Sequence, residues 1–194
     1  FHPVSSDADM FASIPAAPYI LGVGRLSPEK GFDDLVSAHA LARQTCPDLK
    51  LVLVGEGPER SALEARADQL GTRPHVIFAG AQDKLAAYYA SALAFVLPSR
   101  FEGLPNALLE AMAQGCTVIS TPLFAAAAEV ITHEQDGLIA ANGTPQALAD
   151  EITDIYGNLE RGSEIGERAR QSAVRFEGGR ICSAWIDYIN THIP

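Results

Sequence analysis

Residues 97–115 read Leu-Pro-Ser-Arg-Phe-Glu-Gly-Leu-Pro-Asn-Ala-Leu-Leu-Glu-Ala-Met-Ala-Gln-Gly, and they join three structural signals in one short segment. The apolar run Ala94–Leu97 that leads into them predicts a buried strand, and a turn around Glu102 follows. Pro105 is favourable at a first helical position, and Gly115 is favourable just after a helix ends. The segment therefore predicts a strand, a turn and a helix in direct succession.

The same alternation of short apolar runs and helical patterns extends over most of the chain. Strands that read as nearly continuous apolar stretches are typical of a parallel sheet covered on both faces. We therefore expect an α/β domain, a Rossmann-like three-layer arrangement in which a mostly parallel sheet of about six strands is flanked by helices. The expected strands are Tyr19–Gly24, Leu49–Val54, Val76–Ala79, Ala94–Leu97, Thr117–Ser120 and Gly137–Ala140.

Helices are expected between these strands, because apolar residues recur there at helical spacing and the ends carry helix-stop or helix-start residues. Gly71 is a C-terminal stop signal, and Thr144 followed by proline is a start signal. The last expected helix contains the single tryptophan, Trp185. The expected helices are Asp33–Thr45, Glu59–Leu70, Asp83–Ser91, Pro105–Gly115, Thr144–Leu159 and Glu164–Ile193.

Composition narrows the class of protein. A length of 194 residues fits one domain with a well-buried core. The net charge of −10 argues against nucleic acid as a partner, because phosphate-backbone binding needs a basic face. Local cations can still bind a small anionic ligand. The apolar runs are too short to cross a membrane.

Cysteine and histidine usage gives no sign of a metal centre. Cys46, Cys116 and Cys182 are widely spaced and odd in number, and the five histidines are scattered. A reduced, cytoplasmic protein without a metal or other cofactor fits this pattern best.

Ligands of such sheets bind beyond the carboxyl ends of the strands, so the residues that follow each strand are the candidates for chemistry. Glu102 lies in the turn after Ala94–Leu97, and Glu110 is the lone carboxylate in the otherwise apolar run from Ala107 to Ala113. We expect a helix that is apolar nearly all round to be buried, so that Glu110 needs a polar cleft or a partner. Unpaired amides and the helix dipole make the start of this helix a candidate anion site.

A second candidate follows the first strand, in Gly22-Val-Gly-Arg-Leu-Ser-Pro-Glu-Lys-Gly31. Gly24 allows a ligand to approach the backbone closely, while Arg25 and Lys30 could neutralise a diphosphate. The dinucleotide fingerprint GxGxxG fails because Ser27 occupies the third glycine position, and no Walker A pattern occurs. A dehydrogenase is therefore a distant alternative.

A third candidate is the backbone of residues 80–82 after the third strand, which could meet the edge of a nucleobase.

An ordered set of motifs runs along the chain: Arg25, the Glu-Lys-Gly that ends at Gly31, Gly-Glu-Gly-Pro at 55–58, Phe-Ala-Gly at 78–80, and Glu102 and Glu110 joined through Gly-Leu-Pro-Asn. This set resembles the retaining group 1 glycosyltransferases. More narrowly, nearly the whole chain looks like the carboxyl-terminal, donor-binding half of their two-domain GT-B fold.

The resemblance implies transfer of a sugar from a nucleoside diphosphate sugar with retention of anomeric configuration and without a metal. Arg25 and Lys30 would hold the diphosphate as leaving group, Glu102 would touch the sugar hydroxyls and Glu110 the ribose. The backbone at Gly103 and its neighbours would complete the diphosphate site. The expected catalytic residues are thus Arg25, Lys30 and Glu102, and the expected donor-binding residues are Gly24, Gly80, Ala81, Gln82, Gly103, Leu104, Pro105, Asn106 and Glu110.

The resemblance also implies a missing part. The chain begins at Phe1 rather than Met, and we expect residues 1–18 to be a linker remnant and residues 19–194 to be the donor-binding domain with its C-terminal helices. The acceptor site, and any association with the inner membrane surface, would belong to an amino-terminal domain, without which the chain would be inactive. One departure is the alanine run 125–128, where the family usually has a glycine-containing loop before a glutamate; this places any role of Glu129 in doubt.

Two other functions stay open on the sequence. A sugar-nucleotide epimerase can share this architecture, although no His or Asp is obviously placed as its acid or base. A non-catalytic module that binds a nucleotide or a protein partner is the other.

Overall fold

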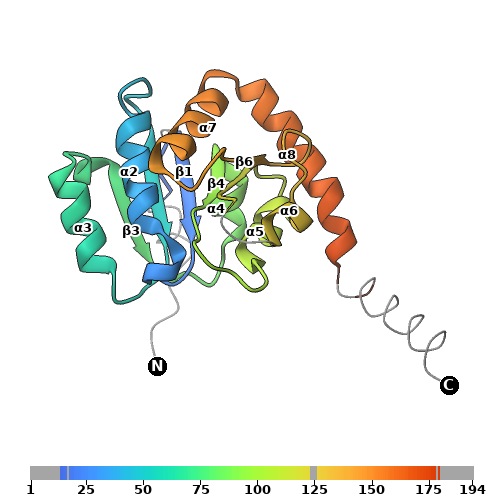
Figure 1. The fold of residues 1–194 in the computed structure, drawn as a ribbon, viewed down its shortest axis with the longest axis horizontal. Coiled ribbons are helices and arrows are strands. Elements are labelled where there is room, and N and C mark those ends of the chain that lie inside the picture. Colours follow the sequence, from blue (N-terminus) through green and yellow to red (C-terminus); the bar gives the residue numbers. More distant parts are fainter. Residues whose placement is uncertain (1–13, 17, 123–125, 178, 180–194) are drawn as a thin grey trace.

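The computed structural model describes residues 14–16, 18–122, 126–177 and 179 (Figure 1). Six strands form one sheet in the order β3-β2-β1-β4-β5-β6, and every pairing between neighbours is parallel. The expected strands and the Rossmann-like α/β class are confirmed. The strands are β1 (Tyr19–Val23), β2 (Lys50–Val54), β3 (Val76–Gly80), β4 (Ala94–Leu97), β5 (Val118–Ser120) and β6 (Leu138–Ile139).

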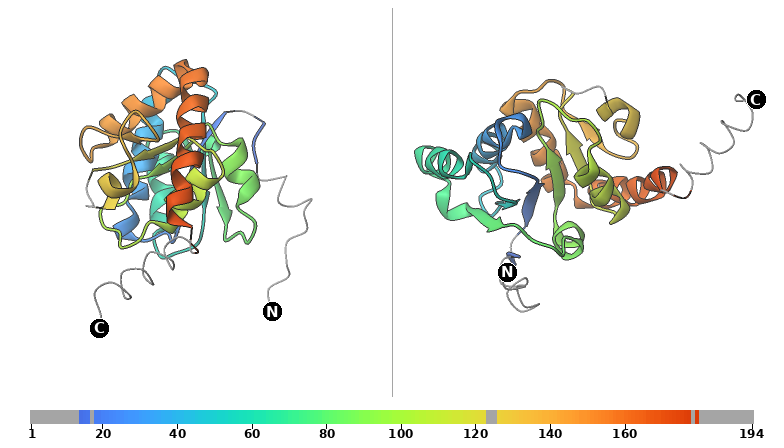
Figure 2. Two further views of the ribbon diagram at one scale, coloured as in Figure 1. Left: turned by 90° about the vertical axis from the view of Figure 1, so that its right-hand side faces the viewer. Right: turned by 90° about the horizontal axis from the view of Figure 1, so that it is seen from below.

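Helices cover both faces of the sheet, as two views turned from Figure 1 show (Figure 2). They are α2 (Phe32–Ala42), α3 (Arg60–Gln69), α4 (Ala86–Ser91), α5 (Asn106–Ala113), α6 (Ala126–Val130), α7 (Pro145–Gly157) and α8 (Leu159–Ala173), with 3-10 turns η1 (Pro28–Lys30), η2 (Arg73–His75) and η3 (Val174–Phe176).

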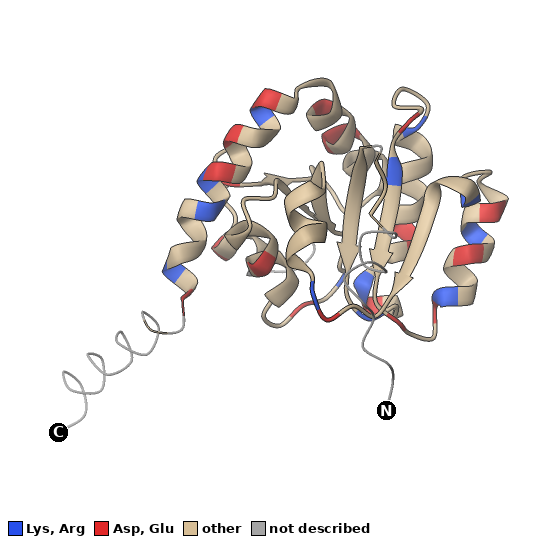
Figure 3. Ribbon diagram, turned by 180° about the vertical axis from the view of Figure 1, so that it is seen from behind, with Lys and Arg blue, Asp and Glu red and all other residues tan. Residues whose placement is uncertain are grey.

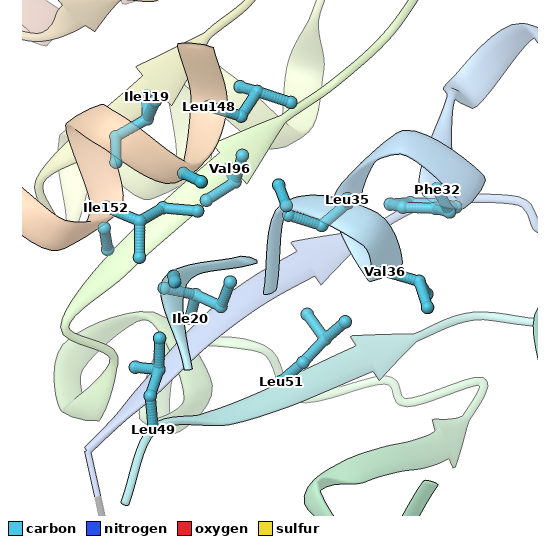
Figure 4. Close-up of a cluster of buried hydrophobic side chains, with 14 of the residues drawn as sticks. Ile20, Phe32, Leu35, Val36, Leu49, Leu51, Val96, Ile119, Leu148 and Ile152 are labelled. Atoms are coloured by element: carbon cyan, nitrogen blue, oxygen red, sulfur yellow. The ribbon is translucent and has the colours of Figure 1, made fainter. Parts of the chain in front are cut away.

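Alternation along the strands divides the core into two layers, because successive side chains of a strand point to opposite faces. Ile20 of β1 and Val96 of β4 pack with α2, α3 and α7 (Figure 4). Leu21 and Phe95, one residue away in each strand, pack with α4, α5, α6 and the end of α8. Strands buried on both sides explain why the sequence shows continuous apolar runs rather than alternation.

Three expectations about helices need correction. The helix expected from Glu164 begins at Leu159, because Asn158 leaves helical geometry to end α7 and its side chain caps α8 by accepting from the Arg161 amide. The helix expected from Asp83 begins only at Ala86. The alanine run contains α6 rather than a loop, as alanine is the strongest helix former. Residues 123–125, most of the expected linker and Trp185 lie outside the described residues.

The strand order creates a switch point between β1 and β4. The chain leaves β1 toward β2 on one side, and it enters β4 only after β3 has completed that half of the sheet. The loops that follow β1 and β4 therefore run in opposite directions and leave a crevice beyond the carboxyl ends of these two strands.

Gly31 fixes how closely those two loops approach. It has φ of +67°, and a Cβ built on it would lie 2.2 Å from the carbonyl oxygen of Pro98. Only glycine satisfies both conditions, so the segment after β1 can rest directly on the segment after β4.

His39 is a fully buried polar side chain on α2. Its Nε2 lies 3.1 Å from the carbonyl oxygen of Leu49, which also accepts from Arg43, so Nε2 is the donor. Its Nδ1 has no hydrogen-bond partner among the described residues. Burial lowers the pKa of His39 to about 4; the Leu49 carbonyl opposes this shift, and the charge of Arg43 adds to it.

This arrangement predicts stability that falls in mild acid. Between pH 6.5 and about 4 the unfolded chain holds a proton on His39 that the folded chain does not, so the free energy of unfolding decreases as the pH is lowered. The expected loss is up to about 3 kcal/mol between pH 7 and pH 4. Urea unfolding of the wild type and of His39→Gln across this pH range measures the free energy of unfolding.

His39→Gln should flatten the pH dependence, because glutamine does not titrate there. His75→Gln is the matched control: that ring is partly exposed and accepts a contact from Lys50, so its loss should remove a smaller part of the slope. Equal slopes for wild type and His39→Gln would contradict the assignment.

Candidate functional site

A cavity of about 300 Å³ opens at the switch point. Its lining comes from three places that are far apart in the sequence: the end of β1, the end of β4 with the loop after it, and the start of α5. Seven predicted site residues take part. The lining residues are Val23, Gly24, Lys30, Leu97, Glu102, Leu104, Pro105, Asn106, Ala107 and Glu110.

Lys30 and Glu102 meet directly across the two loops. Lys30 Nζ donates to Glu102 Oε1 over 2.6 Å, and Ser99 Oγ donates to the same oxygen over 2.7 Å. Ser99 is fully buried, while the Lys30 side chain keeps 24% of its surface exposed and that of Glu102 keeps 9%. Glu102 Oε2 has no hydrogen-bond partner among the described residues, which leaves one carboxylate oxygen to accept from a ligand.

The cavity is bounded on another side by the beginning of α5. Asn106 and Ala107, its first two residues, line the cavity. The amide of Asn106 donates to the Leu104 carbonyl oxygen, and those of Leu108 and Leu109 donate to the Pro105 carbonyl oxygen. The partial positive charge of the helix N-terminus and Lys30 together favour an anion. Figure 3 shows acidic and basic residues side by side on the loops at this end of the sheet.

Glu110 is placed differently from the sequence-based expectation. Helix α5 is not buried all round: Leu108, Ala111 and Met112 are buried, whereas Glu110 lies on the exposed side. The helix covers the sheet with one face only, so Glu110 needs no buried partner. Its Oε2 nevertheless accepts a hydrogen bond of 3.2 Å from the hydroxyl of Tyr89.

Tyr89 is a permanent donor to that carboxylate. The side chain is buried, and burial first, then the charge of Glu110, raises the pKa of its phenol far above the physiological range. The phenol therefore stays protonated and remains a hydrogen-bond donor to the Glu110 carboxylate.

A second hollow of about 350 Å³ adjoins the first, and Glu110 belongs to both. It lies between the start of α4 and the end of α5. Its lining residues are Asp83, Leu85, Ala86, Tyr89, Glu110, Ala113 and Gln114.

Five predicted site residues do not line either hollow. Arg25 is exposed, and its side chain has no hydrogen bond or ion pair among the described residues. Gly103 is exposed on the loop after β4. Gly80 is the last residue of β3, and Ala81 and Gln82 follow it; β2 separates this strand from β1. The carbonyl oxygen of Gly80 accepts from the Gly55 amide, and the Gln82 side chain donates to the carbonyl oxygen of Ala79.

The structure adds residues that sequence reasoning left out of the site. Ser99 sits just after the strand, so its position was a usable signal for a role next to Glu102. Tyr89 and Asp83 gave no such signal, because neither residue type nor spacing shows that α4 lies beside α5.

No group of three or more His, Cys, Asp or Glu side chains within the described ranges is arranged to hold a metal ion. None of the helices in the described part of the chain has the length and apolar composition to span a membrane. Cys46 and Cys116 are buried free thiols, and Cys182 lies outside the described residues.

Curated relatives share sequence with most of the chain. An exopolysaccharide phosphotransferase of Streptomyces coelicolor is 31% identical over 162 residues, which are 83% of this chain and 17% of that protein. A GDP-mannose-dependent α-(1-6)-phosphatidylinositol monomannoside mannosyltransferase of Mycobacterium tuberculosis is 31% identical over 191 residues, covering 87% of this chain and 49% of the relative. The chain thus spans half or less of the length of these relatives.

Solved structures share the fold. The C-terminal domain of a group 1 glycosyl transferase family protein from Francisella tularensis superposes with a TM-score of 0.75 at 25% identity, covering 85% of this chain and 88% of that one. HepE of Anabaena, solved with UDP, gives a TM-score of 0.84 at 23% identity over 96% of this chain and 54% of its own.

The family model described as glycosyl transferases group 1 matches residues 9–172, which is most of the chain. The six-stranded parallel sheet, the crevice at its switch point and these sequence relationships agree. The chain belongs to the group 1 glycosyl transferase family.

Proposed function

We propose that this chain is the donor-binding domain of a retaining glycosyltransferase and holds a nucleoside diphosphate sugar in the β1–β4 crevice. The observation that carries the proposal is the convergence of Lys30, Glu102, Glu110 and the start of α5 on one cavity. A cation and a helix N-terminus suit a diphosphate, and the two carboxylates suit the hydroxyls on either side of it.

Each part of the donor has a place in this proposal. The diphosphate lies between Lys30 and the start of α5, with the sugar against Glu102 and its free oxygen. The ribose meets Glu110, which stands between the two hollows, and the nucleoside extends into the second hollow toward Asp83. HepE was solved with UDP, which supports a nucleotide in a domain of this fold.

The reaction requires stabilisation of a leaving group. The bond between the anomeric carbon and the β-phosphate oxygen breaks, and its electron pair stays on the diphosphate. The acceptor oxygen forms the new bond to the anomeric carbon, and its proton passes to the departing diphosphate. Fixed cations and helix amides stabilise the charge that grows on the diphosphate, so these residues lower the barrier without a metal.

The acceptor site belongs, in this proposal, to a further domain. The relatives are at least about twice as long as this chain, and the mycobacterial relative is named for a lipid-linked acceptor. A cytoplasmic reaction, at the inner membrane surface where the acceptor is lipid-linked, is the setting that we propose.

Removing a cation should weaken nucleotide binding. Lys30→Met and Arg25→Met should each reduce the affinity for UDP, GDP or ADP by about tenfold or more, since a charged hydrogen bond is lost. For Arg25 this requires the exposed side chain to turn onto the diphosphate. Isothermal titration calorimetry measures the nucleotide affinity of each variant. In an active transferase either loss should cost about 3 kcal/mol of barrier, about a hundredfold in rate.

Lys50→Met is the matched control. Lys50 begins β2 at the opposite end of the sheet and pairs with His75, so its loss should leave nucleotide affinity unchanged. The proposal is wrong if the wild type binds none of the three nucleotides. Epimerisation of a sugar nucleotide without any acceptor would favour an epimerase instead.

Glu102→Gln should separate product binding from turnover. The change removes a negative charge from the oxygen that now pairs with Lys30, so a free nucleoside diphosphate should bind about threefold to tenfold more tightly. Transfer should become slower, because the sugar loses a charged hydrogen-bond acceptor. Calorimetry with the free diphosphate decides; weaker binding would show that Glu102 supports the diphosphate rather than competing with it.

A further inference from the structure

The donor site depends on two loops that the sequence does not connect closely. Lys30 follows β1 and Glu102 follows β4, and their ion pair of 2.6 Å forms only if the two loops keep one register. Direct support between the loops is therefore a condition for the cavity, and Arg100 contributes to it through both its side chain and its amide.

Within the described residues, all hydrogen bonds of the Arg100 side chain go to the segment that surrounds Lys30. Its Nη1 donates to the carbonyl oxygen of Pro28 over 2.7 Å. Its two terminal nitrogens donate to both carboxylate oxygens of Asp33, over 2.9 and 2.8 Å, and Nη2 also donates to Asp34. A planar guanidinium that grips one carboxylate with two parallel bonds fixes direction as well as distance.

The main chain continues the same connection. The amide of Arg100 donates to the carbonyl oxygen of Glu29 over 2.9 Å. Two residues after Glu29, the backbone of Gly31 packs against the carbonyl oxygen of Pro98, which lies two residues before Arg100. Lys30 is thus enclosed between residues 28–29 and 33–34, all of which are tied to the loop that also carries Glu102.

The guanidinium of Arg100 is paired with two carboxylates and is therefore not a free cation. Burial would raise the pKa of Asp33, but the hydrogen bonds and charge of Arg100 outweigh it and hold that pKa below its ordinary value. Burial and then the charge of Asp33 raise the pKa of Asp34. Arg100 does not line either hollow, and its guanidinium forms ion pairs with these two carboxylates at the start of α2.

We infer that Arg100 is a positioning residue for the donor site: by gripping Asp33 and the Pro28 carbonyl it holds Lys30 at the place where it meets the diphosphate. The inference rests on the proposed donor site. Arg100 itself does not touch the nucleotide. Lysine cannot replace it, because a point charge lacks the fork that bridges Asp33 and Pro28.

The direction in which Asp33→Asn changes the nucleotide affinity distinguishes a positioning role of Arg100 from simple electrostatic attraction. Asp33→Asn removes a negative charge near an anion site, so electrostatic attraction alone predicts tighter binding of a nucleoside diphosphate. Positioning predicts weaker binding, since the fork of Arg100 loses its charged partner. We expect Asp33→Asn, Arg100→Lys and Arg100→Ala each to weaken binding of UDP, GDP or ADP by about tenfold, as a displaced binding group would.

The double variant tests whether the two residues act as one unit. In the Asp33→Asn background, Arg100→Ala should cost much less than it does alone, because the grip is already lost. Asp154→Asn is the matched control: it breaks the ion pair with Arg161, far along the chain, and should leave nucleotide affinity unchanged. Thermal unfolding of every variant shows that binding is compared between folded proteins.

The outcomes are distinct. Nucleotide binding by the wild type with unchanged or tighter binding in Asp33→Asn and Arg100→Lys overturns the role of Arg100 and leaves the donor site standing. Loss on Arg100→Ala with full rescue by lysine assigns Arg100 to charge attraction and overturns positioning. A wild type that binds none of the three nucleotides overturns the donor site and the inference with it.

Discussion

The carbonyl oxygen of Pro98 lies where a side chain on residue 31 would begin. Because that residue is glycine, two loops from non-consecutive strands touch through their backbones beside the crevice between β1 and β4. Lys30 is the residue before Gly31, and Glu102 lies four residues after Pro98. The close approach of the two backbones therefore brings the side chains of Lys30 and Glu102 within reach of one another. The sheet supplies the crevice, and the contact of Gly31 with Pro98 determines which side chains meet in it.

The fold was predictable because its signals are local. The strands read as apolar runs because β1, β2, β4 and β5 are buried on both faces, and turn or helix-stop residues lie near their ends. The candidate site was predictable only in part. Residue type and spacing identified Lys30, Glu102 and Glu110, but the partners of Glu102 and Glu110 arise from packing. That Tyr89 reaches Glu110 depends on α4 lying beside α5, which no spacing in the sequence encodes.

The mistaken burial of α5 has a physical origin. A helix rich in alanine and leucine reads as apolar on every side, yet the sheet can cover only one face of it, and the other borders the two hollows. An overall charge of −10 is equally uninformative about the site. The field at the crevice is set by one lysine, one helix end and two carboxylates that are held by neutral hydroxyl donors. A strongly acidic chain can therefore contain a site that suits an anion.

Glu110 forms part of the wall of both hollows, and Tyr89 donates a hydrogen bond to its carboxylate. This shared wall matters for the design of small-molecule ligands. A fragment in the hollow beside α4 and a fragment in the crevice beside Lys30 would each border the same carboxylate, because Glu110 lines both hollows. Joining them through a short hydroxyl-bearing linker at that point would convert two weak associations into one intramolecular pair, with affinity raised through effective concentration rather than through new contacts.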